Sequence, residues 1–112
     1  MLPTPSLTLS KRRMKILSNT ERHSEVLALL HEIYIQKNKR YGNSANRTFK
    51  KFGALSYAIR LSDKMERFTE LVKDPSLDNK DTDESIIDTL LDLANYAIMA
   101  VMDLTEKDDT ER

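Results

Sequence analysis

The residues best suited to chemistry are three acids that recur every fourth position, Glu84, Asp88 and Asp92, in an otherwise apolar segment. At this spacing their carboxylates lie on one side of a helix, where each pair repels by about 0.2–0.5 kcal/mol. Asn95 extends the same side. Beyond Asp92 the segment is apolar nearly all round, which is typical of an enclosed helix. Because no lysine or arginine follows one turn later on this helix, the acids need a counter-charge from elsewhere.

A divalent cation is one possible counter-charge. Magnesium is commonly held by one or two carboxylates together with waters and substrate phosphates. Asp88 and Asp92 are one turn apart, so both can reach the same ion. Asp63 and Glu66 offer a similar but weaker pair on the preceding helical segment. This spacing predicts Mg²⁺ as a cofactor.

The preceding segment also supplies cations, because Arg60, Lys64 and Arg67 recur there at helical spacing. Salt bridges from these side chains would close the acidic ladder without any metal. A third interpretation is also open, in which the acids are the solvated side of an ordinary amphipathic helix.

Composition bounds the class of protein. The 112 residues are long enough for one domain with a modest core. Lys plus Arg equals Asp plus Glu at 18 each, so no net positive charge attracts nucleic acid or anionic membrane. The segment "RTFKKF" mixes basic and aromatic residues as nucleic-acid-binding segments do, but without a net positive charge it leaves nucleic acid an unlikely partner. No uninterrupted apolar run reaches the roughly 18 residues of a membrane span, so we expect no membrane. The absence of cysteine fits a cytoplasmic protein.

Apolar residues at helical spacing predict three long helices, from about residue 19 to 41, 49 to 72 and 82 to 107. Asn19 or Thr20 can cap the first, and Gly42 can end it. The segment "YGNSANRT", residues 41–48, is predicted to be a connector, and Gly53 weakens the start of the second helix. The fold class is therefore all-α, an antiparallel bundle of three helices completed by oligomerisation. This helical domain covers residues 18–107, with a flexible tail at 1–17 and a disordered C-terminus at 108–112.

Three segments in this order, "YIQKNKRYGNS", "IRLSDKMERFTELV" and "DESIIDTLLDLANYAIMAVMDL", resemble the nucleotide modification associated domain 1 family. Its members are small proteins frequent in phages and bacteria, and the resemblance covers residues 23–104. More distantly, that family is similar to the all-α nucleoside triphosphate pyrophosphohydrolases of the MazG and dimeric dUTPase type. Those enzymes are Mg²⁺-dependent bundles, usually dimers or tetramers, that cut a nucleotide between its α and β phosphates. The resemblance implies a nucleotide-derived ligand and a homodimer or homotetramer.

The resemblance also implies roles for single residues. The distant relatives carry Glu-Glu-x-x-Glu on one helix and Glu-x-x-Asp on the next, whereas this chain has Asp63-Lys64-Met65-Glu66 and then Asp88 and Asp92 at a spacing of four. The implied catalytic and metal-binding residues are Asp63, Asp88 and Asp92, with Glu84 as a further metal ligand. The implied nucleotide contacts are Lys37, Asn38, Arg60, Lys64, Arg67, Asn95 and Tyr96.

Three functions follow from these observations. The chain is a Mg²⁺-dependent pyrophosphohydrolase of a nucleoside triphosphate or modified nucleotide, a protein that binds or sequesters a nucleotide without cutting it, or an oligomeric helical scaffold. The departures from the acid motifs favour binding over hydrolysis, whereas the pair at Asp88 and Asp92 favours a metal enzyme.

Overall fold

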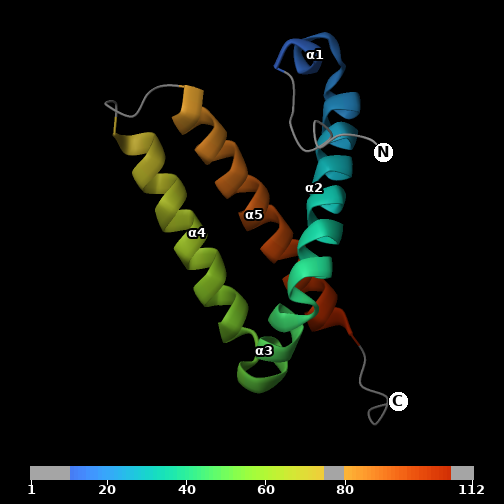
Figure 1. Cartoon of the computed structure of the whole chain (residues 1–112), viewed down its shortest axis with the longest axis vertical. Helices are drawn as coiled ribbons and strands as arrows, with labels where there is room; N and C mark the ends of the chain where they lie inside the picture. The colour runs from blue at the N-terminus through green and yellow to red at the C-terminus, as the bar shows by residue number, and fades with distance from the viewer. Residues whose placement is uncertain (1–10, 75–79, 107–112) are drawn as a thin grey trace. The chain divides into compact units, whose positions relative to one another are not determined.

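The computed structural model describes residues 11–74 and 80–106, with side chains described for 14–74 and 83–106. Every regular element in this part of the chain is a helix (Figure 1). The helices form two compact units, Met1–Gly42 and Asn43–Arg112, and each is described by itself. The all-α prediction is confirmed. The elements are α1 (Lys11–Ile16), α2 (Asn19–Tyr41), α3 (Ser44–Phe52), α4 (Leu55–Lys73) and α5 (Lys80–Thr105).

In the first unit, α2 begins at a capping box formed by Ser18 and Glu21. The N–H of Glu21 donates to Ser18 Oγ at 3.1 Å, and the N–H of Ser18 donates to Glu21 Oε1 at 2.9 Å. The hydrogen bond from the Ser18 backbone, and to a lesser extent the Ser18 side chain, lowers the pKa of the Glu21 carboxyl. The cap predicted at Asn19 or Thr20 is therefore wrong by one position, because only Ser18 places a glutamate three residues ahead.

The predicted end of this helix at Gly42 is confirmed. Gly42 has a φ of 61°, and its N–H donates to the carbonyl of Asn38 at 2.7 Å. Glycine adopts this backbone conformation without the clash that a Cβ would cause.

Helix α1 lies inside the segment predicted as a flexible tail. Its sequence "KRRMKI" contains neither proline nor glycine, so nothing in it breaks a helical turn. The rest of the predicted tail up to residue 10, and the C-terminus predicted to be disordered at 108–112, lie outside the described residues.

The predicted connector at 41–48 and the continuous helix predicted at 49–72 are both wrong where they meet the second unit. Residues Ser44–Phe52 form α3, which ends at Gly53. Gly53 has a φ of 72°, and its N–H donates to the carbonyl of Phe49 at 2.7 Å. A glycine at positive φ ends a helix instead of merely weakening it, so one expected helix becomes two.

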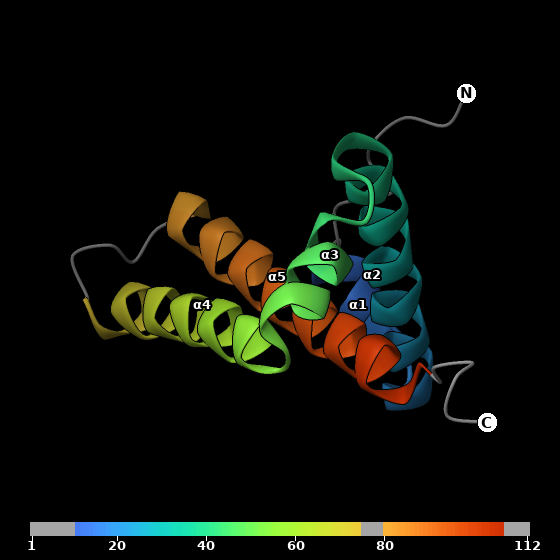
Figure 2. The same ribbon diagram turned by 90° about the horizontal axis from the view of Figure 1, so that it is seen from below.

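Helices α4 and α5 lie antiparallel and side by side (Figure 1). Figure 2 shows α3 at the end of this pair where α4 begins and α5 ends. There Asp103 accepts hydrogen bonds from Tyr57 Oη at 2.5 Å and from Asn46 Nδ2 at 2.7 Å. Phe49 packs against Tyr57 with ring centroids 5.9 Å apart, and Tyr57 is buried. These contacts join three helices, and we call Asn46, Tyr57 and Asp103 the closed end.

Helix α5 is unusually apolar. From Asp83 to Thr105 it is long and apolar enough to cross a membrane by length and composition, although acids interrupt it. This is weak evidence of a span, because the core helix of a soluble protein passes the same test. Acids that face another helix, as Asp92 and Asp103 do, are costly to place in lipid and instead favour packing within protein.

Candidate functional site

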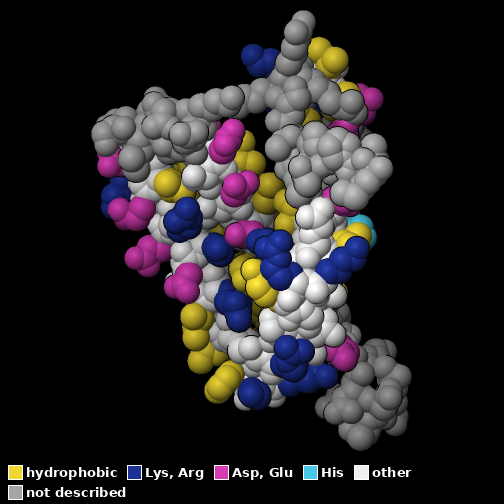
Figure 3. Space-filling model, viewed as in Figure 1, with side chains coloured by type: hydrophobic (Ala, Val, Ile, Leu, Met, Phe, Trp, Pro, Cys, Tyr) yellow, Lys and Arg dark blue, Asp and Glu magenta, His cyan; other side chains and the backbone are white. Residues whose placement is uncertain are grey.

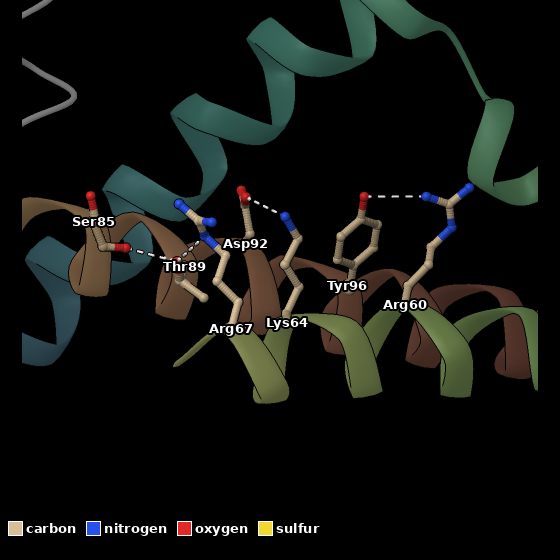
Figure 4. Close-up of polar contacts among 7 residues, drawn as sticks. All are labelled: Arg60, Lys64, Arg67, Ser85, Thr89, Asp92 and Tyr96. Atoms are coloured by element: carbon tan, nitrogen blue, oxygen red, sulfur yellow. Dashed lines mark hydrogen bonds and ion pairs between the residues drawn. The ribbon is translucent and has the colours of Figure 1, made fainter. Parts of the chain in front are cut away.

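A row of polar contacts runs along the seam between α4 and α5 (Figure 4). Three basic residues of α4 each meet one polar residue of α5. We call these six residues the polar row: Arg60 with Tyr96, Lys64 with Asp92, and Arg67 with Thr89.

The three contacts differ in kind. Arg60 Nη1 lies 3.4 Å from Tyr96 Oη, and its guanidinium carbon lies 5.5 Å from the centroid of the tyrosine ring, a cation–π distance. Arg67 Nε donates to Thr89 Oγ1 at 3.2 Å, and this hydroxyl in turn donates to the carbonyl of Ser85 at 2.7 Å. The row therefore combines an aromatic site, an ion pair and a hydroxyl-bound guanidinium.

Helical periodicity explains why these side chains meet. The α4 members are separated by steps of four and then three residues, and the α5 members follow the same steps in the opposite direction. Residues spaced in this way lie on one face of a helix, so two antiparallel helices bring them together pair by pair. In Figure 4 the side chains of the row rise to the same side of the two helices.

The central contact supplies a counter-charge for the acidic ladder. Lys64 Nζ lies 3.2 Å from Asp92 Oδ2, and the two side chains are 30% and 24% exposed. Both are thus half-buried, and the cation beside the carboxylate stabilises it. A counter-charge from the neighbouring helix, one of the interpretations of the sequence, is therefore present at Asp92.

The other predicted acids surround the row without joining it. Asp63, Glu84 and Asp88 are exposed. Asp63 lies three residues from Arg60, and Asp88 lies one turn before Asp92, so both flank the row. Figure 3 shows acidic and basic side chains interspersed over α4 and its border with α5.

The same acids bear on the predicted magnesium site. Within residues 14–74 and 83–106, no three metal-ligating side chains converge. A dedicated protein cage is therefore not formed by the described residues. Asp88 and Asp92 still fit the sparser arrangement in which Mg²⁺ takes one or two carboxylates and completes its shell with waters and phosphates.

The remaining predicted contacts are placed as follows. Asn95 is half-buried on α5, three residues after Asp92. Lys37 and Asn38 lie near the end of α2, where Lys37 is exposed and Asn38 is half-buried. Both belong to the first unit, so the polar row is described without them.

A cavity of about 780 Å³ lies beside the last turns of α4. It shares only Asp63 and Arg67 with the predicted site, and its other charged lining residues are mostly acids. An acidic lining repels phosphate, so this cavity is a poorer anion site than the row. Its lining residues are Asp63, Glu66, Arg67, Glu70, Leu71, Lys73 and Asp74.

Sequence reasoning missed two parts of this unit. Thr89 was overlooked although it lies three residues before Asp92 and four after Ser85, on the same face of the helix. Asp103 was overlooked because its partners Asn46 and Tyr57 are far from it in sequence and were assigned to a connector and an apolar stripe. No local signal marks such a contact.

The nucleotide modification associated domain 1 family matches residues 37–104, more than half of the 112-residue chain. The chain belongs to this family. The matched segment of this nucleotide modification associated domain 1 protein begins at Lys37 and contains the whole polar row. No curated protein and no solved structure matches the chain, so the more distant likeness to all-α pyrophosphohydrolases stays a prediction.

Proposed function

We propose that this chain binds a nucleotide or nucleotide-derived molecule in the cytoplasm, with the phosphates on the polar row of α4 and α5. The observation that carries the proposal is the alignment of Arg60, Lys64 and Arg67 along one seam. Each contacts a polar side chain of α5 whose place a phosphate oxygen can take. The family description, which refers to nucleotide modification, supports the same ligand class.

The length of the row suits a chain of phosphates. Seven residues separate Arg60 from Arg67, which corresponds to about 10.5 Å at 1.5 Å per residue. Arginine offers several N–H donors in a fork that matches phosphate oxygens, and lysine adds a compact positive charge. Consecutive phosphates can therefore each find a cation without any change in the backbone.

Tyr96 gives the row a direction. Its ring lies at the Arg60 end and presents a flat aromatic surface on which a base can stack. We therefore infer that the base lies toward Tyr96 and Asn95, and that the phosphates extend toward Lys64 and Arg67. Lys37 and Asn38 belong to the first unit and stay predicted nucleotide contacts that this site does not include.

The ion pair at Lys64 and Asp92 must open for this binding. A phosphate then takes the ammonium group, and Mg²⁺ can take its place beside the Asp92 carboxylate. Asp88, one turn away and exposed, can share that cation with Asp92. The charges of the site stay balanced in both states.

This exchange favours a second candidate function, Mg²⁺-dependent pyrophosphohydrolysis. When bound, the metal would polarise a phosphate oxygen and lower the pKa of an attacking water. Asp88 and Asp92 would hold it, and Arg60 and Arg67 would stabilise the charge that develops on the phosphates.

A thermal melt of the full chain with a panel of NTPs and dNTPs, with and without Mg²⁺, tests the binding proposal. We expect at least one nucleotide to raise the Tm, and calorimetry then gives its Kd. Lys64→Ala should raise that Kd roughly 10-fold or more, because a hydrogen bond to a charged group contributes about 1.5–3 kcal/mol.

Lys73→Ala is the matched control. Lys73 is also a cation on α4, but it pairs with Glu70 at 3.0 Å outside the row and is well exposed. It should leave the Kd within about twofold, since exposed pairs contribute little. An equal loss in both variants, or no nucleotide response at all, would overturn the binding site.

Asp88→Asn separates hydrolysis from binding. If the chain hydrolyses nucleotides, wild type should release pyrophosphate with Mg²⁺, and this variant should lose that release while still binding without Mg²⁺. Wild type that returns all nucleotide intact would leave the chain a binder.

A further inference from the structure

Among the three contacts of the polar row, the one between Arg67 and Thr89 has its own chemistry. Arg67 Nε donates to Thr89 Oγ1 at 3.2 Å, and Thr89 Oγ1 donates to the carbonyl of Ser85 at 2.7 Å. The hydroxyl proton is therefore committed to Ser85, and a lone pair of the same oxygen is directed to Arg67 (Figure 4). Thr89 is only 3% exposed, so it is better placed to hold Arg67 than to contact a ligand itself.

Thr89 holds Arg67 without neutralising it. Asp92 offsets the charge of Lys64 in the ion pair at 3.2 Å, whereas a hydroxyl carries no charge. The contact also uses Nε alone. In the part of the chain that the structure describes, no hydrogen bond or ion pair engages the two terminal Nη groups of Arg67. These groups form the end of the guanidinium fork and can bind two oxygens of one phosphate.

Acids on the same helix compete for Arg67. Asp63 lies four residues before it and Glu70 three residues after it, and oppositely charged side chains pair at these spacings on a helix. Among the described residues, however, Arg67 forms no ion pair, and Glu70 pairs with Lys73 at 3.0 Å. Arg67 instead crosses the seam to Thr89. The hydroxyl therefore directs the guanidinium toward α5 and away from the acids of α4.

We propose that Thr89 is a positioning residue of the nucleotide site, which holds Arg67 with its terminal nitrogens available to phosphate. This role rests on the proposed function. Because the guanidinium is fixed before the phosphate arrives, less side-chain freedom is lost on binding. Without the hydroxyl, Arg67 turns to Asp63 or Glu70, and a phosphate must then displace a carboxylate.

The contact at Arg67 also survives binding, unlike the ion pair of Lys64 and Asp92. A phosphate oxygen can take the place of the Thr89 hydroxyl, but the open Nη groups offer it a site that leaves the hydrogen bond intact. One end of the polar row is thus ordered in advance, while its centre exchanges partners.

Calorimetric titration of the full chain with inorganic triphosphate tests this role, because the probe carries phosphates and no base. Thr89→Val removes the hydroxyl and keeps nearly the same shape. It should raise the Kd about 3- to 10-fold, the effect of one lost hydrogen bond. Thr89→Ser keeps the hydroxyl and should bind within about twofold of wild type. A Thr89→Val that binds like wild type, or a Thr89→Ser that loses as much as Thr89→Val, would overturn the role.

Thr69→Val is the matched control. Thr69 Oγ1 donates to the carbonyl of Met65 at 2.9 Å, so it makes the same kind of bond to its own helix as Thr89 does. It is exposed on α4 and lies outside the polar row. This variant should leave the Kd within about twofold of wild type, because such local bonds do not hold a cation. An equal loss in Thr69→Val would contradict a specific role for Thr89.

Combined variants distinguish positioning from a purely structural role. If Thr89 acts through Arg67, Thr89→Val should add nothing to the Kd of Arg67→Ala. It should keep its full effect in Lys64→Ala, where Arg67 is still present. The same added loss in both backgrounds would show that Thr89 acts on the fold and not on Arg67.

Arg67→Lys is a second test that leaves the buried hydroxyl and the positive charge in place. A lysine has one ammonium group, so it cannot contact Thr89 and grip a phosphate through separate nitrogens. The Kd should rise about 3- to 10-fold, as in Thr89→Val. Arg67→Lys that binds like wild type would overturn the role even if Thr89→Val fails to fold.

NMR of the Arg67 Nε–H group tests the contact without any ligand. The signal is assigned by its loss in Arg67→Lys. Because Thr89 accepts this hydrogen, its exchange with water should be several-fold slower in wild type than in Thr89→Val. Equal exchange rates would show that the hydroxyl does not hold the guanidinium.

The outcomes separate this role from the proposed function. Binding that is weakened in Lys64→Ala and Arg67→Ala but unchanged in Thr89→Val would leave the polar row as the site and remove Thr89 from it. A wild type that responds to neither triphosphate nor any nucleotide would overturn both.

Discussion

Two acids of α5 face α4 in different ways. At the closed end, Asp103 accepts hydrogen bonds from two neutral donors, Tyr57 and Asn46, at 2.5 and 2.7 Å. In the polar row, Asp92 faces the ammonium group of Lys64 at 3.2 Å. Asp103 is thus held by two side chains of low flexibility from two other helices, whereas Asp92 faces one long and flexible side chain.

The difference separates structural from exchangeable contacts. Removing Asp103 would take away the acceptor of two part-buried hydrogen bonds, from Tyr57 and Asn46, which is costly. Removing Lys64 or Asp92 opens a partly exposed ion pair whose halves can turn to water. The polar row, which we propose as the ligand site, therefore has the weaker kind of contact.

The largest expected effect is at the closed end. Asp103→Ala should lower the free energy of unfolding by about 2–4 kcal/mol, because it removes two hydrogen bonds to a charged acceptor. Asp92→Ala, the same substitution on the same helix, should cost about 1 kcal/mol or less. Urea denaturation of both variants measures the contrast, and equal losses would contradict the division into two kinds of contact.

A smaller effect is expected where α3 joins α4. Gly53→Ala should cost about 1–3 kcal/mol, because a φ of 72° with a ψ of −161° is a backbone conformation that essentially only glycine adopts. No atom lies within 4 Å of the added Cβ, so backbone strain alone would cause the loss. Ala54→Gly is the control and should cost less. A neutral Gly53→Ala in urea denaturation would show that the closed end does not require this turn.

The smallest effect on stability is expected at the capping box of α2, where the Glu21 carboxylate is fully exposed. Hydrogen bonds from Ser18 place the pKa of Glu21 below its ordinary 4.5 in the folded chain. The unfolded chain then binds this proton more readily, so the contribution of Glu21 is present above pH 4.5 and is lost as the pH falls through the folded pKa. Glu21→Gln should therefore show a slightly flatter Tm profile in this acidic range, and an identical profile would rule out the contribution.

Local chemistry made much of the helical structure predictable. Gly42 ended a helix where expected, and the apolar stripes of α4 and α5 follow the expected period. The start of α2 was predicted correctly, but its cap was misassigned because Asn19 and Thr20 are good caps by type, whereas only Ser18 has Glu21 at the matching distance. The connector at 41–48 was wrong because its Asn and Ser residues indicate a turn locally, although they begin a helix here.

The residues of the candidate site could be predicted from the sequence, but not which of them contact one another. Arg60, Lys64 and Arg67 were recognised as cations on one face, and Asp88 and Asp92 as acids on another helix. Which of them meet depends on the lengthwise register of two antiparallel helices, and no single helix carries that information.

The amino-acid sequence by itself determined that this chain is helical, that its family is nucleotide modification associated domain 1, and that α5 is both acidic and apolar. These properties follow from side-chain spacing and composition, which are local. Only the tertiary structure decided that Lys64 neutralises Asp92, that Asp103 binds α3, and that Asp88 stays exposed beside the row. Those contacts depend on helix register, which is fixed when apolar side chains of both helices pack together.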